Sequence, residues 1–149
     1  MAVNTDPIYS KVGDIQWSAT SALFATAMTA GNVSSYDGTD ANIKSIFTAD
    51  ATNGGYVQRI RAKCAALTGT SAASVLRIWV NNGSTAGTAV NNVLIGEVSL
   101  PAVSNTVVAA NPDIEYPLNI ALPPGYKLLA GIGTAVTTGW VVAVFGGKY

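Results

Sequence analysis

The chain has 149 residues, the size of one domain with a sizeable core. Eight basic residues balance eight acidic ones, and 11% of all residues are charged, against about 25% in a typical soluble domain. Nucleic acid is not the expected partner, because binding to phosphates usually needs a basic excess, and a membrane surface is not expected either. Such weak charge favours a surface that is partly buried in an assembly.

The chain has one cysteine, Cys64, and no histidine. A disulfide within the chain is therefore impossible, and Cys64 is expected to be a small buried hydrophobic residue. Without histidine the chain has no Ser-His-Asp or Cys-His arrangement, lacks the usual zinc ligands and lacks the commonest general base. We therefore expect no enzyme activity, no cofactor and no metal.

The N-terminus has no basic start followed by an apolar run, so no secretory signal is expected. The longest clearly apolar run, Trp140–Phe145, is far shorter than the roughly twenty residues of a membrane span. We expect a product made in the cytoplasm. Residues 1–12 hold Pro7 and no firm strand pattern, so they are expected to form an extended arm before a single domain at 13–149.

Strand patterns recur along the first half of the chain, and Tyr56–Leu67 is the clearest of them. Apolar residues including Ile60 and Cys64 share one face, with charged residues on the other. This period of two predicts a strand half-buried in a sheet. The other predicted strands of this half are Ile15–Ala19, Ile43–Ala49 and Ser74–Asn81.

In the second half, a glycine and a proline stand inside strand patterns. Gly96 predicts a bulge or a close approach of backbones, and Pro117 predicts an edge strand. A helix is expected only at Ser18–Ala30. The predicted strands of this half are Val93–Leu100, Ser104–Ala110 (the weakest), Ile114–Leu122, Tyr126–Ile132 and Trp140–Phe145.

These seven to nine short strands are separated by loops of glycine, proline and asparagine. That pattern predicts an antiparallel β-sandwich or barrel. The closing strands are apolar on both faces, which suits the middle of a sandwich or an interface between subunits.

Two acidic patterns in the sequence could form chemical sites. Asp37–Asn42 places three oxygen-bearing side chains in a short loop, as calcium sites do, but the spacing is not that of an EF-hand, and Asx-rich turns have the same composition. Asp113 and Glu115 share a strand face, as paired catalytic acids could. We interpret the first as a plain turn, and the second as a solvated face that discourages edge-to-edge pairing.

Arg59, Arg61 and Lys63 form a basic ladder on one strand face, and Arg77 joins it if the next strand pairs alongside. Such a ladder is a solvated face, a protein contact or, with a basic excess that is missing here, a nucleic-acid site. Six aromatic residues could form a sugar-binding platform, although aromatics in a sandwich are usually core or interface anchors. They are Trp17, Tyr56, Trp79, Tyr116, Tyr126 and Trp140.

Several segments resemble a family of small virion proteins of tailed phages and prophages. The resemblance covers most of the chain and is weakest between Ser18 and Asn42. It is carried by the opening Met1–Thr5, by Arg77–Ser84, Asn91–Pro101 and Leu122–Leu128, and by the ending Gly139–Tyr149. These are scaffold patterns, so no catalytic residue is carried over.

The resemblance implies a capsid decoration (cement) protein with a jelly-roll-like sandwich of about eight strands. It implies the virion, on the capsid surface, as location, the major capsid protein as partner, and a homo-oligomer, with a trimer favoured. The alternative is a tail or fibre module that binds a host glycan or receptor. The residues expected to contact the capsid are Asp6, Pro7, Ile8 and Tyr9 of the arm, and Arg59, Arg61, Lys63 and Arg77 of the ladder.

Overall fold

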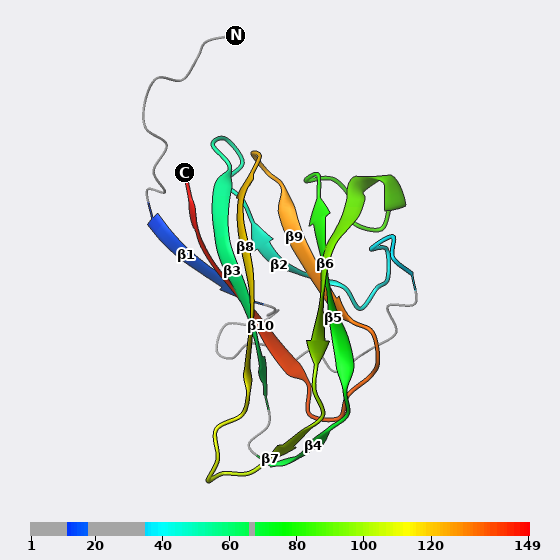
Figure 1. The fold of residues 1–149 in the computed structure, drawn as a ribbon. Helices are drawn as coiled ribbons and strands as arrows, with labels where there is room; N and C mark the ends of the chain where they lie inside the picture. Colours follow the sequence, from blue (N-terminus) through cyan, green and yellow to red (C-terminus); the bar gives the residue numbers. More distant parts are fainter. Residues whose placement is uncertain (1–11, 18–34, 66–67) are drawn as a thin grey trace.

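The computed structural model describes residues 12–17, 35–65 and 68–149, and these residues are all-β apart from one 3₁₀ turn, η1 (Ala89–Asn91) (Figure 1). The predicted fold class is therefore confirmed. The predicted helix and residues 1–11 of the arm lie outside the described residues, whereas Val12 belongs to the first strand. The strands are β1 (Val12–Trp17), β2 (Lys44–Thr48), β3 (Gly55–Cys64), β4 (Gly69–Ser71), β5 (Ser74–Asn81), β6 (Asn92–Leu100), β7 (Val103–Asn105), β8 (Asp113–Leu122), β9 (Lys127–Ile132) and β10 (Trp140–Lys148).

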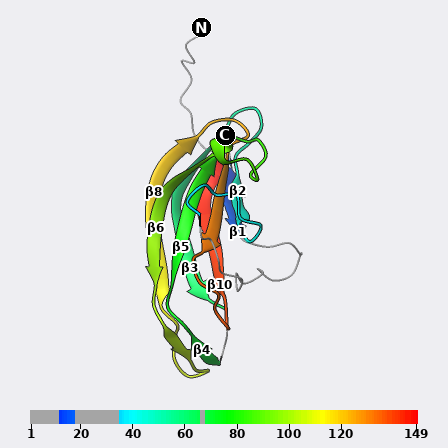
Figure 2. The ribbon, with the colours of Figure 1, turned by 90° about the vertical axis from the view of Figure 1, so that its right-hand side faces the viewer.

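Two four-stranded antiparallel sheets face each other (Figures 1 and 2). Sheet A has the strand order β1-β10-β3-β8, sheet B has the order β2-β9-β5-β6, and β4 and β7 form a short two-stranded sheet at one end. The pairing is nested: β1 pairs with β10, β2 with β9, β3 with β8 and β5 with β6. This is a long hairpin rolled up across two sheets, which is the jelly-roll arrangement expected for this chain.

The core lies between the sheets and draws on both closing strands. Trp140, Val142 and Val144 of β10 are fully buried, and so are Leu128 and Ala130 of β9. Each of these two strands is paired on both sides, β10 with β1 and β3, and β9 with β2 and β5. The expectation that the closing strands lie in the middle of a sandwich is confirmed.

Bulges break the strict alternation that the sequence predicts. Against β9 the register of β2 shifts between Ser45 and Phe47, so the consecutive residues Ile46 and Phe47 are both buried. The same happens in β3, where a strict alternation puts Val57 on the face of Arg59, Arg61 and Lys63, but Val57 is fully buried. The register of β3 against β10 skips Gln58 there. An extra residue in one strand turns the side chains after it to the other face.

The predictions for Gly96 and Pro117 are confirmed. The register between β5 and β6 shifts beside Gly96, and a Cβ atom there would lie 2.7 Å from the Tyr116 hydroxyl of β8. A side chain at position 96 would therefore require either the Tyr116 side chain or β6 to shift. Pro117 lies in β8, which is an edge strand of sheet A, where a missing backbone N–H is tolerated.

The outer face of sheet B is covered by the chain's own loops. Trp79 of β5 and Leu129 of β9 are buried there against Ile43, Ala86 and Leu94. The Trp79 indole N–H donates a hydrogen bond to the backbone carbonyl of Tyr36 at 2.9 Å. The described residues provide no comparable cover for the outer face of sheet A.

Candidate functional site

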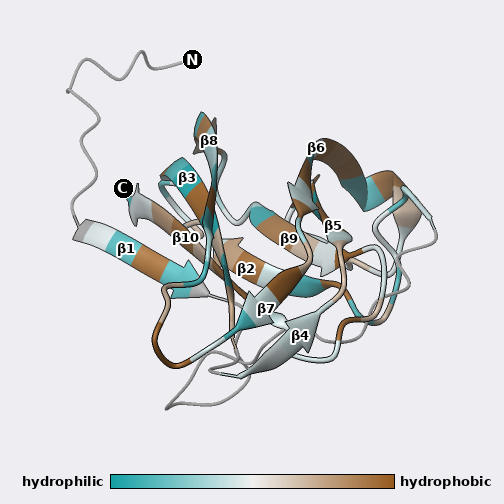
Figure 3. Ribbon diagram, turned by 60° about the horizontal axis from the view of Figure 1, so that its bottom comes forward, coloured by the Kyte–Doolittle hydropathy of each residue, from teal (hydrophilic) through white to brown (hydrophobic). Residues whose placement is uncertain are grey.

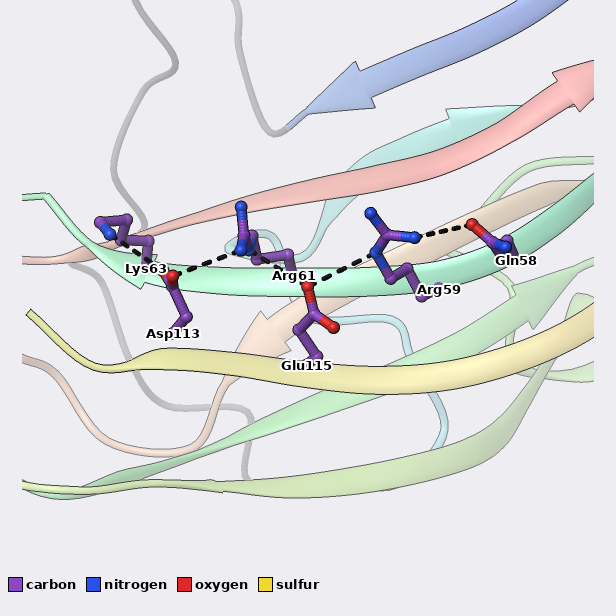
Figure 4. A network of polar contacts seen from close by, with 6 residues as sticks. All are labelled: Gln58, Arg59, Arg61, Lys63, Asp113 and Glu115. Atoms are coloured by element: carbon purple, nitrogen blue, oxygen red, sulfur yellow. Dashed lines mark hydrogen bonds and ion pairs between the residues drawn. The ribbon is translucent and has the colours of Figure 1, made fainter.

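The basic ladder lies on the outer face of sheet A, and each of its three basic side chains has an acidic partner on β8 (Figure 4). Arg59 is 3.4 Å from Glu115, Arg61 is 3.3 Å from both Glu115 and Asp113, and Lys63 is 2.9 Å from Asp113. The register places Arg61 opposite Glu115 and Lys63 opposite Asp113, which explains the pairing. The ladder is therefore a lattice of ion pairs, in which two carboxylates offset most of the charge of the three basic side chains, and not a free positive stripe.

These contacts also determine the role of Asp113 and Glu115. Asp113 and Glu115 point outward together, and both contact Arg61. The hydrogen bond from Lys63, with a smaller contribution from the charge of Arg61, lowers the pKa of Asp113 below its usual range. A carboxyl held ionised in this way is a poor general acid. The two acids thus act as cross-strand partners of β3, which fits their interpretation as a solvated edge.

Arg77 does not join the ladder, because the condition for it, that the next strand pairs alongside β3, is not met. The neighbours of β3 are β10 and β8, because the chain crosses to the other sheet before it forms β5. Arg77 instead donates a hydrogen bond to Glu97 at 2.8 Å, and its guanidinium lies 4.8 Å from the centre of the Tyr36 ring. It therefore holds the outer face of sheet B together.

A shallow pocket of about 440 Å³ lies beside the ion-pair lattice. Ile15 and Phe145, which are register partners, contribute apolar side chains to its lining, and the Arg59 guanidinium lies 4.6 Å from the centre of the Phe145 ring. Sequence reasoning missed this pocket, since it forms only when β1 and β3 pair on either side of β10. Its lining residues are Gly13, Asp14, Ile15, Tyr56, Gln58, Phe145 and Gly146.

The six aromatic residues do not assemble into one sugar platform within the described residues. Trp140 is fully buried in the main core between the sheets, whereas Trp79 is fully buried in the separate cluster on the outer face of sheet B. Tyr116 and Tyr126 pack against the main core, and Tyr56 lines the pocket on sheet A. The side chain of Trp17 lies outside the described residues.

The loop at Asp37–Asn42 is built as a pair of Asx turns. The Asp37 carboxylate accepts hydrogen bonds from the backbone N–H and the hydroxyl of Thr39, and Asp40 accepts one from the backbone N–H of Asn42 at 2.7 Å. Hydrogen bonds, first from Ser35 and then from Thr39, lower the pKa of Asp37. Over the described ranges no three acidic or thiol side chains gather as metal ligands would. The geometry is that of the plain turn.

Cys64 is buried, as predicted, at the end of β3. Its sulfur accepts a hydrogen bond from the Asn105 side-chain amide at 3.3 Å and lies 3.3 Å from the Thr138 hydroxyl. These contacts tie the short β4–β7 sheet to the end of the sandwich.

Two exposed apolar tips lie at opposite ends of the molecule (Figures 1 and 2). In the loop between β7 and β8, Val107 is 73% exposed and Val108 is 90% exposed. At the other end, Val90 of η1 is 89% exposed and Val93 is 57% exposed. The prediction of a strand over Ser104–Ala110 is wrong beyond Asn105, because β7 has only the three-residue β4 to pair with.

Comparison with models of protein families, with curated proteins and with solved structures found no match for this chain. No helix within the described ranges has the length and apolar character needed to cross a bilayer. The expected capsid contacts at Asp6, Pro7, Ile8 and Tyr9 lie outside the described residues. Function therefore has to be argued from the fold, from the surface of sheet A and from the apolar tips.

Proposed function

We propose that the protein is a phage capsid decoration protein, which binds the assembled head and stabilises it through protein–protein contacts. The observation that carries this proposal is the nested jelly-roll pairing of the strands. Jelly rolls are typical of viral capsid domains, lectins and cupins. The resemblance of several segments to tailed-phage virion proteins favours the first of these three classes.

The open face of sheet A supports the same choice. A cupin-type metal centre depends on histidine ligands, and the chain has none. The face is broad and mixes ion pairs with apolar residues such as Ile15 and Phe145. Arginine and aromatic residues together are typical of protein interfaces, whose area is usually far larger than that of a small-molecule pocket.

Stabilisation of the head would follow from mass action. A protein that binds capsomers only in their assembled arrangement shifts the equilibrium towards assembly. A trimer of the protein would match three-fold positions on the shell, because a symmetric oligomer presents the same contact three times. The major capsid protein is the partner in this scheme.

The test is co-sedimentation of the purified protein with undecorated heads of the phage that encodes it. We expect saturable binding at a fixed ratio to the major capsid protein, and a higher melting temperature of the decorated heads. Heat-unfolded protein added at the same concentration is the control. Absence of binding to intact heads would refute the proposal.

A second candidate is a tail or fibre module that binds a host glycan, and the pocket on sheet A favours it. Tyr56 offers an aromatic ring, while Asp14 and Gln58 offer polar groups that line the same pocket. Aromatic rings next to hydrogen-bonding side chains are a common way to hold a ligand. Binding on a panel of bacterial glycans that a Tyr56→Ala variant loses would support this candidate over the capsid.

A further inference from the structure

The loop that joins β7 to β8 exposes an uninterrupted apolar segment (Figure 3). Every residue from 106 to 110 is exposed, and Val107, Val108, Ala109 and Ala110 follow one another at its tip. The sequence from 101 to 112 contains no charged residue at all. Exposed apolar residues usually occur singly on a soluble protein, so a run of four on a protruding tip points to a contact.

The tip is held firmly at both of its ends. Before it, Asn105 is buried and donates a hydrogen bond to Cys64. After it, Asp113 is paired with Lys63 on the neighbouring strand. Anchoring of both ends restricts the backbone of the loop, which lowers the entropy lost when a partner covers the tip.

The apolar tip at the opposite end of the sandwich is built differently. There Val90 and Val93 are separated by two asparagines whose side chains are engaged within the protein. Asn91 donates to the Thr85 carbonyl at 2.9 Å, and Asn92 donates to the Ala86 carbonyl at 2.7 Å. The polar residues interrupt the apolar surface, so this end offers two separate side chains and no continuous patch.

We propose that the tip at residues 106–110 inserts into an uncharged apolar hollow on the protein surface of the assembled capsid; this inference rests on the function proposed above. The absence of charge on the segment matches an uncharged partner surface. Small β-branched and alanine side chains fit a narrow hollow in a protein. A lipid surface fits less well, because membrane-binding tips carry basic and aromatic residues and the first charge here is the acidic Asp113.

The test compares two double variants in the head co-sedimentation assay, both checked for an unchanged melting temperature. In Val107→Ser/Val108→Ser we expect binding to undecorated heads to weaken at least tenfold. Val90→Ser/Val93→Ser is the matched control, since it also removes two exposed valines, and we expect its binding to stay within twofold of the parent chain. Equal binding of the parent chain and the Val107→Ser/Val108→Ser variant would refute the inference and leave the proposed function standing.

Other outcomes would overturn the inference in different ways. If the parent chain itself fails to bind heads, the proposed function falls and the inference falls with it. Binding of the parent chain to neutral or anionic phosphatidylcholine-based vesicles, lost in the Val107→Ser/Val108→Ser variant, would assign the tip to a membrane. A dimer of the parent chain that this variant abolishes would assign it to a second copy.

A cross-linking experiment gives an independent readout of the same contact. Cys64 is buried, so a Val108→Cys variant can be labelled at the tip with a thiol-directed photo-cross-linker. On heads we expect a cross-link to the major capsid protein from position 108, and at most a weak one from the same label in a Val90→Cys variant. A stronger cross-link from position 90 would contradict the proposal.

Discussion

Exchange of Asn92 for aspartate should strongly destabilise the fold, because Asn92 joins two loops to β6. Its side-chain nitrogen donates to the carbonyls of Ala86 at 2.7 Å, Asp37 at 3.1 Å and Gly38 at 3.3 Å. Its side-chain oxygen accepts a hydrogen bond from the buried Asn81 amide at 2.8 Å. Asn92→Asp keeps the shape and the Asn81 contact but turns the donor into a charged acceptor that faces three carbonyl oxygens.

The magnitude follows from these contacts. The two N–H groups of the amide are lost, each worth about 1 kcal/mol net, and carbonyls left facing a carboxylate add roughly 1–3 kcal/mol. We therefore expect the free energy of unfolding to fall by about 3–5 kcal/mol, and the melting temperature to fall by roughly 10 °C. Urea titration followed by tryptophan fluorescence measures this change, since Trp79 lies under the same loops. Asn82→Asp is the matched control, because Asn82 is exposed, its oxygen would still accept the Ser84 N–H, and it would lose only one exposed hydrogen bond, to Asn91.

The pH dependence of Asn92→Asp gives a second check. Carbonyl oxygens around the new carboxyl disfavour its charged form, so its pKa in the folded state is raised above the unfolded value. The destabilisation is then complete above the folded pKa and becomes smaller as the pH falls below it, because the protonated carboxyl can donate again. A loss below about 1 kcal/mol at neutral pH, or a loss that grows on acidification relative to the parent chain, would refute this account of Asn92.

Three further predictions concern the sheets. The hydrogen bond from Lys63 lowers the pKa of Asp113 below its ordinary value of 3.8, so the Asp113 carboxylate stabilises the fold above pH 3.8, and this contribution is lost as the pH falls through the lower folded pKa. Lys63→Met should raise the pKa of Asp113 in a carboxyl ¹³C NMR titration, and an unchanged pKa would contradict the pairing. A Cβ on Gly146 would overlap the backbone of β3, so Gly146→Ala should lower the free energy of unfolding by about 2–3 kcal/mol in urea titration, and a neutral result would show that β10 can shift. The Gln16 side-chain amide forms hydrogen bonds with both the backbone N–H and the backbone carbonyl of Thr48, at 2.8 Å and 3.2 Å, and so blocks the edge of β2. Gln16→Ala should lower the free energy of unfolding by about 1–2 kcal/mol and increase light scattering on storage. Unchanged scattering would mean that the edge is protected in another way.

Local patterns in the sequence were enough to predict most of the strands. Ser74–Asn81 was predicted with its observed bounds, since its alternation is uninterrupted. Gly96 and Pro117 marked a bulge and an edge because each acts through its own backbone, by lacking a side chain or an N–H. The absence of histidine, the single cysteine and the neutral charge are properties of composition, and no fold could change them.

The surfaces were decided by tertiary structure. The Arg59, Arg61 and Lys63 ladder is a free positive stripe in the sequence, and most of its charge is offset by Asp113 and Glu115 only because β8 pairs alongside β3. The sequence predicts a strand where the exposed tip around Val107 and Val108 lies, because an apolar run has the same pattern whether or not a neighbouring strand exists to cover it.

The sequence by itself therefore determined an all-β domain with no histidine-based chemistry, and the approximate place of most strands, although not of β4. Only the three-dimensional fold decided the nested pairing, the bulges at Ser45–Phe47 and Gln58, and the loops that cover the outer face of sheet B. The physical reason is the range of the interactions. Alternation and turn chemistry act over a few neighbouring residues, whereas strand partners and buried surfaces are set by contacts between segments far apart in the chain.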